Sequence, residues 1–347
     1  MRFSRLLILT VCLFFLWTCN SCKDHRVVHR GFYYWKTNVM ISPYEQSFMD
    51  SLKSTLLYVR FFDVDATPDG KSIKPIAIAH FDKKITTQKI IPTVFITPKA
   101  LNAIQWNTVD KDAQNIAALL EKKAGAIELL PGEIQIDCDW TANTKGIYFE
   151  LLQALKRQPF FKDKILSVTI RMHQVKYRAS AGMPPADKGI LMVYNMDRLD
   201  DINVENSIFN ESLAEDYLKN IGNYPLKLDV AFPIFSWSLL FENGILKGIL
   251  RDWKPVFFED KSLFEMKKMN QFLVLKDTVL NGYSLKKNQL IRYEYSDIKA
   301  LSKISKYISR RLNKESLNIL LYHCDAHNFK QYQIQDLERL FTDFNTY

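Results

Sequence analysis

The chain has 347 residues, and its 47 lysines and arginines exceed its 38 aspartates and glutamates, which gives a formal net charge of +9. Hydrophobic residues make up 47% and charged residues 24%, a balance that excludes a disordered, collagen-like or coiled-coil chain. With only 11 glycines and 12 prolines, long flexible linkers are not expected. The length suits one large domain or two ordinary ones.

Residues 1–21 have the pattern of an export signal. Two arginines precede the apolar run Leu6–Trp17, which is too short to span a bilayer and has the length of a signal-peptide core. Cys22 follows the small residue Ser21, and small residues are what a signal peptidase accepts before its cleavage site. We therefore predict a lipoprotein acylated at Cys22, with Cys19 as the second choice, anchored in the cell envelope of a bacterium. A plain secreted protein is the alternative.

The remaining charge points to no acidic partner. Loss of the two N-terminal arginines with the signal lowers the net charge from +9 to about +7, spread along the chain. The densest basic stretch, Lys303–Lys314, has apolar residues at helical spacing, which indicates a solvated helix face. We expect a monomer with no nucleic-acid partner, and no cofactor, because no nucleotide-binding fingerprint is present.

Eight apolar runs, each ending in polar residues, predict buried strands. Helical patterns separate most of them, and strands that alternate with helices favour a parallel sheet. The predicted strands are Val28–Tyr34, Leu57–Val64, Ile91–Ile96, Ile134–Trp140, Ile165–Met172, Ile190–Tyr194, Leu226–Phe232 and Leu317–His323. The predicted helices are Pro43–Ser54, Asp110–Lys123, Ile147–Arg157, Ser212–Ile221, Asp297–Leu312 and Gln335–Phe344.

Eight such units predict an α/β fold, a (β/α)₈ TIM barrel that fills residues 22–347 as a single domain. The surplus length falls in an insertion at about 251–295, between strands seven and eight, where Asn281-Gly282 predicts a hairpin turn. A second excursion, Thr67–Gln88, follows the second strand. A doubly wound open sheet is the alternative fold.

Polar side chains gather where the predicted strands end, and that end of a TIM barrel carries the active site. Alternation along a strand places Asp137, Asp139 and Thr141 on one face of strand four. A lone strand-end aspartate is often only a helix cap, but recurrence on several strands weakens that interpretation. The aromatic residues near these ends offer flat surfaces for the apolar faces of sugars.

Three segments resemble glycoside hydrolase family 18, the chitinase and endo-N-acetylglucosaminidase family. Ile136–Trp140 (IDCDW) is similar to its fourth strand, D-x-x-D-x-D-x-E; Met192–Asn195 (MVYN) to its sixth; and Leu226–Trp237 to its seventh. The whole chain also resembles a group of Bacteroidota lipoproteins that begin FYYWKT and contain RFFDVD, a resemblance that implies no activity.

The family resemblance implies roles for particular residues. Asp139 and Tyr194 occupy the places of the groups that orient the substrate's acetamido nucleophile, whereas Thr141 stands where the family has its general acid, a glutamate. Thr cannot donate a proton usefully near neutral pH. Two readings follow: a hydrolase in which Asp63 or Asp65 supplies the acid opposite Asp139, or a glycan-binding protein that has lost catalysis.

The candidate site is therefore defined by acids, aromatic residues and polar groups at the predicted strand ends. The candidate catalytic residues are Asp63, Asp65, Asp137, Asp139 and Tyr194; the candidate glycan-binding residues are Tyr34, Trp35, Lys36, Trp140, Arg171, His173, Asn195, Trp237, His323 and Asp325. A divalent metal held by the two histidines and nearby aspartates is a weaker alternative, because no metal-binding spacing such as HxH occurs. Cys138 and Cys324 are expected to be free thiols that face the helices.

Overall fold

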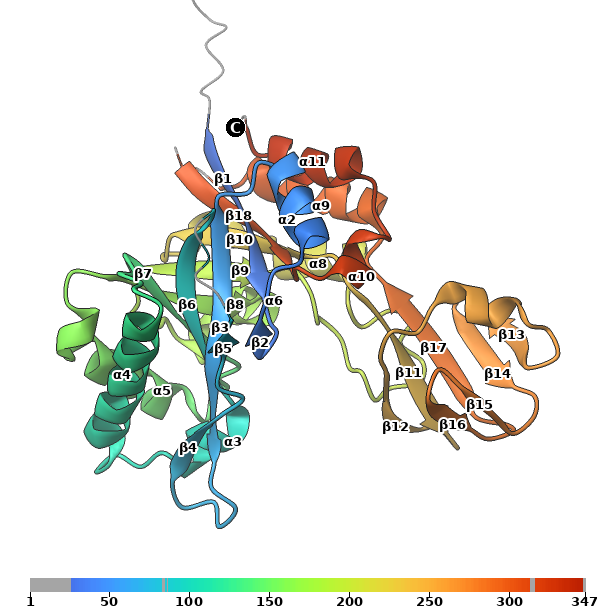
Figure 1. Ribbon diagram of the computed structural model, residues 1–347, viewed down its shortest axis with the longest axis horizontal. Coiled ribbons are helices and arrows are strands. Elements are labelled where there is room, and N and C mark those ends of the chain that lie inside the picture. Colours follow the sequence, from blue (N-terminus) through green and yellow to red (C-terminus); the bar gives the residue numbers. More distant parts are fainter. Residues whose placement is uncertain (1–25, 83–84, 86, 313–315, 346–347) are drawn as a thin grey trace, which may run out of the picture.

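Eight parallel strands form a closed barrel in the computed structural model (Figure 1), which describes residues 26–82, 85, 87–312 and 316–345. The barrel closes because β1 pairs with β3 on one side and with β18 on the other. The barrel strands are β1 (Val27–Tyr34), β3 (Leu56–Ala66), β6 (Lys89–Ile96), β7 (Glu133–Cys138), β8 (Ile165–Arg171), β9 (Lys188–Met192), β10 (Leu228–Pro233) and β18 (Ser316–Tyr322). The predicted TIM barrel is confirmed, and the open-sheet alternative is wrong.

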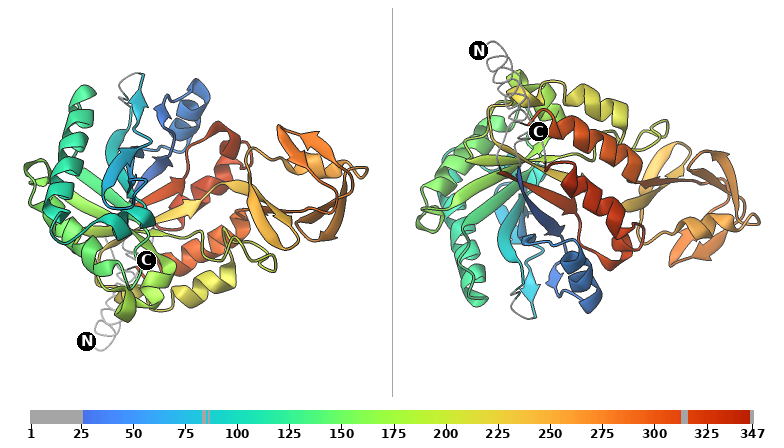
Figure 2. Two further views of the ribbon diagram at one scale, coloured as in Figure 1. Left: turned by 90° about the horizontal axis from the view of Figure 1, so that it is seen from below. Right: turned by 90° about the horizontal axis from the view of Figure 1, so that it is seen from above.

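The six predicted helices are present and cover the outside of the barrel (Figure 2). They are α2 (Pro43–Ser51), α4 (Val109–Ala126), α5 (Lys145–Lys156), α8 (Glu211–Tyr217), α9 (Ile298–Ser309) and α11 (Ile334–Thr342). Local signals set their ends: Ser42 and Glu45 form a reciprocal capping box at α2, and Asp297 caps α9. Four shorter helices were not predicted: α3 (Pro98–Ala103), α6 (Met172–Lys176), α7 (Arg178–Ala181) and α10 (Ala326–Phe329).

Buried charges are paired at the end of the barrel where the strands begin. Lys188 Nζ lies 2.8 Å from Glu133 Oε2 and 2.8 Å from Asp229 Oδ2. The hydroxyl of Tyr58 donates to Glu133 at 2.9 Å. Ions removed from water must be paired in this way. Lys188, Glu133 and Asp229 line a cavity of about 600 Å³ at this end. The opposite end, where the strands finish, is the mouth of the barrel.

The insertion is a separate antiparallel sheet between β10 and β18. It begins at Ser236, before the expected start at Arg251, because the hairpin of β11 (Ser236–Glu242) and β12 (Ile245–Leu250) also belongs to it. Its strand order is β12-β11-β17-β14-β13, with β13 (Phe264–Lys268), β14 (Gln271–Val274) and β17 (Leu290–Tyr295). The short helix η3 (Pro255–Glu259) lies beside it, and Trp253 and Phe258 belong to its own small core. It projects from one side of the barrel (Figures 1 and 2).

The expected hairpin turn lies within this insertion. Asn281 and Gly282 join β15 (Thr278–Leu280) to β16 (Tyr283–Leu285), and both residues have positive φ, 50° and 79°. A two-residue hairpin turn needs this left-handed backbone at both positions, which Asn-Gly adopts readily. The excursion after β3 contains β4 (Ile73–Ile76), which pairs antiparallel with β3, and β5 (His80–Phe81), which pairs with β2 (Asn38–Val39).

Both cysteines of the described chain are buried free thiols. Cys324 Sγ lies 3.9 Å from Met49 Sδ of α2, on the helix side of the barrel, and burial raises the pKa of both thiols. The predicted signal segment, with Cys19 and Cys22, lies outside the described residues. Among the helices that the structure describes, none is both long and apolar enough to cross a membrane.

Candidate functional site

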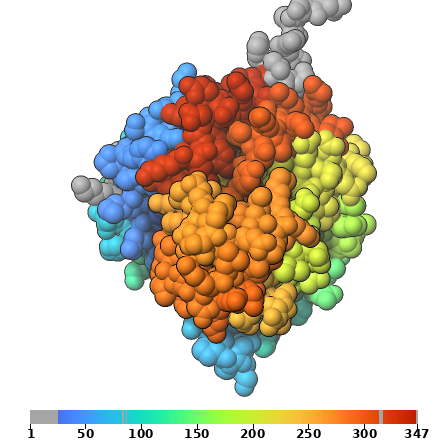
Figure 3. All heavy atoms as spheres, turned by 90° about the vertical axis from the view of Figure 1, so that its right-hand side faces the viewer, coloured from blue at the N-terminus to red at the C-terminus, as the bar shows by residue number. Residues whose placement is uncertain are grey.

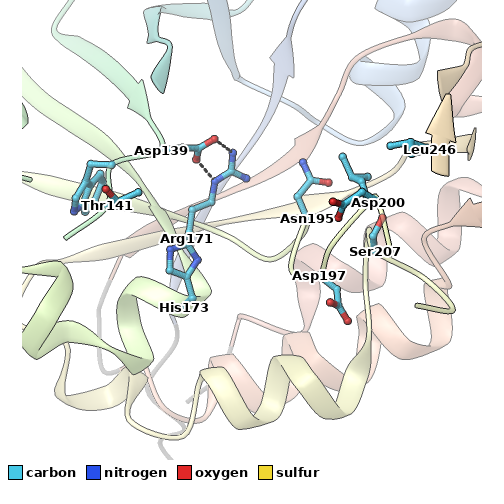
Figure 4. A pocket seen from close by; sticks show the side chains of 11 residues that line it. Asp139, Thr141, Arg171, His173, Asn195, Asp197, Asp200, Ser207 and Leu246 are labelled. Carbon is cyan, nitrogen blue, oxygen red and sulfur yellow. Dashed lines mark hydrogen bonds and ion pairs between the residues drawn. The ribbon is translucent and has the colours of Figure 1, made fainter. Parts of the chain in front are cut away.

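Two cavities open at the mouth of the barrel and share one lining residue, Asn195. The first, of about 590 Å³, lies beside the ends of β7, β8 and β9 (Figure 4). Its lining includes Asp139, Trp140, Thr141, Arg171, His173, Asp197, Asp200, Ser207 and Leu246. The second, of about 680 Å³, lies beside the ends of β1, β10 and β18. Its lining includes Trp35, Lys36, Arg60, Phe235, Trp237, Arg251, Asp252, Tyr322, His323 and Asp325.

The insertion contributes to both cavities. Leu246 of β12 lines the first, and Ile249, Arg251 and Asp252 line the second. The space-filling view shows the insertion adjoining the chain that follows β9 at the surface (Figure 3). The mouth is thus bounded by strand ends on one side and by the insertion on the other, and together the cavities can hold an extended ligand.

Asp139 is held by Arg171 at the wall of the first cavity (Figure 4). Arg171 donates from Nε to Asp139 Oδ1 at 2.5 Å and from Nη2 to Oδ2 at 3.0 Å. The two residues meet because the register of β7 against β8 pairs Gln135 with Ser167, four positions earlier on each strand. Burial disfavours the charged guanidinium, but the attraction of Asp139 outweighs this and raises the pKa of Arg171. This carboxylate is therefore an acceptor bound at two points.

Asp137 lies beneath Asp139 and lines neither cavity. Its side chain is buried and accepts a hydrogen bond from Thr169 Oγ1 at 2.6 Å. Burial, together with the negative charge of Asp139, raises the pKa of Asp137 to about 6. It is a carboxyl group that can be protonated near neutral pH, but it is enclosed.

Asp63 and Asp65 are also committed to partners. Arg60 donates to both oxygens of Asp63, at 2.6 and 2.7 Å. A bulge in β3 inserts one residue between Arg60 and Phe62, so Arg60 and Asp63 face the same side although they are three positions apart. Burial raises the pKa of Asp63 despite its arginine partner. Neither Asp63 nor Asp65 lines a cavity.

The side chain of Asp65 points to the start of α3. It accepts a hydrogen bond from Thr97 Oγ1 at 2.6 Å, which lowers the pKa of Asp65. Thr97 is the residue that caps α3, since its side chain also accepts from the backbone of Ala100. A carboxyl group with a lowered pKa is a poor general acid. Asp65 instead supports the capping residue of α3, because it accepts the hydrogen bond from Thr97.

A third ion pair lies at the second cavity. Lys36 Nζ lies 2.8 Å from Asp325 Oδ2 and 2.7 Å from Glu45 Oε1. Burial disfavours the ammonium group, but hydrogen bonds to both carboxylates raise the pKa of Lys36. Asp325 also caps α10, accepting from the backbone N–H of His327 at 2.7 Å. This network ties the end of β1 to α2 and α10.

Aromatic rings form the floor of the second cavity. Tyr322, which sequence analysis did not single out, stacks on Tyr194 at 5.2 Å between ring centroids and contacts Phe235 at 5.7 Å and Trp35 at 5.9 Å. Trp237 packs on Phe235 at 5.2 Å. Of these rings, all but Tyr194 line the cavity. They give this cavity an apolar, aromatic surface.

Tyr194, Trp140 and Tyr34 are placed differently from expectation. Tyr194 lies below the mouth, lines neither cavity, and its hydroxyl has no hydrogen-bond partner among the described residues. Trp140 is 1% exposed and donates from Nε1 to the carbonyl of Ala181, so it supports the wall rather than offering a face. Tyr34 is buried and donates to the carbonyl of Met40. Tyr34 points away because it is adjacent to a residue that faces inward, whereas Trp140 still lines the first cavity.

His173 and His323 line different cavities, so they do not form one site. Desolvation lowers the pKa of both, that of His323 to about 4. Within the described ranges, no group of three or more His, Cys, Asp or Glu side chains is placed to hold a metal ion.

Several cavity residues lie beyond what sequence patterns reveal. Asp197 and Asp200 follow the predicted sixth strand closely enough to have been included as strand-end acids. Arg60 reaches the mouth only because of the bulge in β3, and Arg251 and Asp252 reach it only through the fold of the insertion. No sequence signal locates Arg60, Arg251 or Asp252 at the mouth.

The barrel and its insertion resemble enzymes that act on glycans. A chitinase from Chromobacterium violaceum is similar at a TM-score of 0.52 and 12% identity, over 91% of this chain and 98% of that one. The Bacillus cereus spore cortex-lytic enzyme SleL gives 0.53 and 15%, over 93% and 75%; its Bacillus megaterium counterpart gives 0.51 and 12%, over 90% and 74%. The chain thus shares the TIM-barrel fold of these proteins, at low sequence identity. No family model and no curated protein matches the sequence.

Proposed function

We propose that this protein binds a glycan at the barrel mouth without hydrolysing it. The observation that carries the proposal is the state of Asp139: both of its oxygens are engaged by Arg171, and Thr141 occupies the neighbouring position where an acid would be needed. An ion-paired carboxylate is an acceptor for hydroxyl groups but not a proton donor. The aromatic floor of the second cavity supplies the stacking surface that a sugar ring needs.

The same pattern recurs around the mouth. The carboxyl group of Asp325 is paired with Lys36, and that of Asp63 with Arg60, so these acids too are engaged by basic side chains. Ion pairs of this kind hold charged donors and acceptors in fixed positions, which suits recognition of hydroxyl and amide groups. Because Asn195 lines both cavities, we infer that the ligand is a chain of more than one sugar.

Hydrolysis is the competing function, and one observation favours it: the pKa values of Asp63 and Asp137 are raised, as a general acid requires. Both groups, however, are buried and line neither cavity. A paired-carboxylate mechanism needs both acids to reach one glycosidic bond. Hydrolysis would therefore require a conformational change that exposes Asp63 beside Asp139.

The deciding experiment measures binding and hydrolysis on the same samples. Chitin oligosaccharides of increasing length are titrated by calorimetry into the wild type, Asp139→Asn and Asp110→Asn, and the products are analysed by mass spectrometry. Asp110 also pairs with an arginine, Arg157, but lines neither cavity, which makes it the matched control. We expect binding without cleavage, weakened by Asp139→Asn alone. Cleavage abolished by Asp139→Asn would establish the hydrolase instead, and the absence of both activities would refute the glycan site.

We further propose that the protein is displayed at the cell envelope through a lipid on Cys22. The support is the signal-like sequence of residues 1–21. A lipid anchor would place the glycan site at a surface where such polymers occur, and acyl chains in pairs give stable attachment.

A further inference from the structure

We propose that Glu294 is the positioning residue that fixes both cavities at once, although it lines neither. Glu294 and Arg292 lie two positions apart on β17, the central strand of the insertion, so their side chains share one face. Both side chains are completely buried, and Arg292 Nε lies 2.7 Å from Glu294 Oε1. This inference rests on the proposed glycan site, whose shape it explains.

The second oxygen of Glu294 accepts three hydrogen bonds from two residues of the mouth. Ser207 donates from its backbone N–H at 3.0 Å and from its hydroxyl at 2.6 Å, and Trp237 donates from Nε1 at 2.7 Å. Ser207 lines the first cavity and Trp237 the second. One carboxylate oxygen therefore joins a residue of each cavity.

The connection continues to the residue that the two cavities share. The carbonyl of Ser207 accepts from the backbone N–H of Met196 at 3.1 Å, and the N–H of Asn195 donates to the carbonyl of Ile208 at 2.8 Å. Asn195 itself is in a left-handed conformation, with φ of 51°, which needs such support in a residue other than glycine. Glu294 thus holds Asn195 in place through Ser207 and its neighbour.

Arg292 secures the remainder of the same loop. It donates to the carbonyl of Asp201 at 2.6 Å and to that of Leu199 at 3.1 Å, and its guanidinium lies 5.1 Å from the ring centre of Phe241. Asn270 and Gln271 of the insertion add bonds to the carbonyls of Glu205 and Ile202. The loop of residues 195–209 and the insertion are thereby fastened into one unit, with the ion pair at its centre.

Ion pairs that are fully buried are weak contributors to stability but can fix geometry, because every partner must be satisfied in one arrangement. Here the hydrogen-bond partners of the ion pair include Ser207 and Trp237, which line the two cavities. A neutral amide of the same size in place of Glu294 would turn an N–H group toward one of its donors. It would also leave Arg292 without a counter-ion.

The first test uses hydrogen–deuterium exchange on the full chain in detergent. We expect Glu294→Gln to speed exchange at residues 195–209 and at the start of β11, with β7 and β8 unchanged. Glu242→Gln is the control, since Glu242 lies on the same sheet and pairs with Lys247 outside the mouth. Unchanged exchange at 195–209, or an equal rise in β7 and β8, would overturn the positioning role.

The second test measures affinity for chitin oligosaccharides. We expect Glu294→Gln to weaken binding about tenfold, as losses of supporting hydrogen bonds do at other sites, and Glu242→Gln to have no effect. Arg292→Met combined with Glu294→Gln removes the unpaired cation and restores stability. If the role is positional, this double variant still binds weakly; wild-type affinity in it would overturn the inference. Failure of the wild type to bind would refute the proposed function. The exchange experiment would still decide whether Glu294 positions the cavity residues.

Discussion

Asp139 and Arg171 form a two-point ion pair at the mouth of the barrel, with N–O distances of 2.5 and 3.0 Å. The pair joins the ends of two neighbouring strands, β7 and β8, and lines the first cavity. The site therefore differs from one in which an unpaired aspartate orients a substrate, because both oxygens of Asp139 already accept hydrogen bonds from Arg171. The predictions below follow from this arrangement and from its surroundings.

Asp139→Asn should lower both stability and glycan affinity. Its loss removes the ion-pair partner of Arg171, whose side chain is 16% exposed, and we expect a cost of about 1–3 kcal/mol in the free energy of unfolding. Asp110→Asn breaks an exposed pair and should cost less than Asp139→Asn does. Urea denaturation of the three proteins measures both values. Equal costs for the two variants would contradict a structural role for the pair at the mouth.

Asp137 should make the protein lose stability as pH rises from about 4 to about 6. Its pKa is raised in the folded state to about 6, whereas an unfolded aspartate titrates near 3.9, so the folded state binds the proton more tightly. The stabilisation is complete below the unfolded value and is lost through the folded one. Asp137→Asn keeps an acceptor for Thr169 and should remove this slope and stabilise the protein at pH 7 by about 3 kcal/mol.

The comparison of wild type with Asp137→Asn isolates this effect from an opposite one. His323, whose pKa is lowered to about 4, contributes stability that is present above about 6.5 and is lost as pH falls toward 4. Because His323 is the same in both proteins, it cancels in the difference between their curves. A difference curve without slope between pH 4 and 6 would contradict the raised pKa of Asp137.

Trp35→Ala should weaken glycan binding about 5- to 30-fold, a loss of about 1–2 kcal/mol of stacking and buried area. Trp35 lines the second cavity and contacts Tyr322. Trp35→Phe retains a flat ring and should recover part of the affinity. The control is Leu130→Ala, because Leu130 is 95% exposed and lines neither cavity. Titration calorimetry gives the three values, and full affinity in Trp35→Ala would exclude the aromatic floor as the binding surface.

Cys22→Ser should abolish acylation and release the protein from the membrane fraction. In the lipoprotein that we propose, the Cys22 thiol is the acceptor of the lipid. Labelling cells with a radioactive fatty acid and fractionating them measures both outcomes. Cys19→Ser, three residues earlier, is the matched control and should remain labelled. The reverse pattern would assign the lipid to Cys19.

Sequence by itself determined the architecture of the barrel, because its signals are local. Each strand is a short apolar run, each main helix has an apolar stripe, and their alternation allowed few arrangements. Local alternation also placed most of the candidate site at one end: ten of the predicted residues line the two cavities. They are Trp35, Lys36, Asp139, Trp140, Arg171, His173, Asn195, Trp237, His323 and Asp325.

Tertiary structure decided what these residues do. Whether Asp139 is a free acid or a bound one depends on the register that brings Arg171 beside it, 32 positions away. The bulge in β3 places Arg60 next to Asp63, and Glu294 meets Ser207 across 87 positions. Such pairings depend on strand register and on the folding of a distant insertion, which hydrophobic patterns along the chain do not encode.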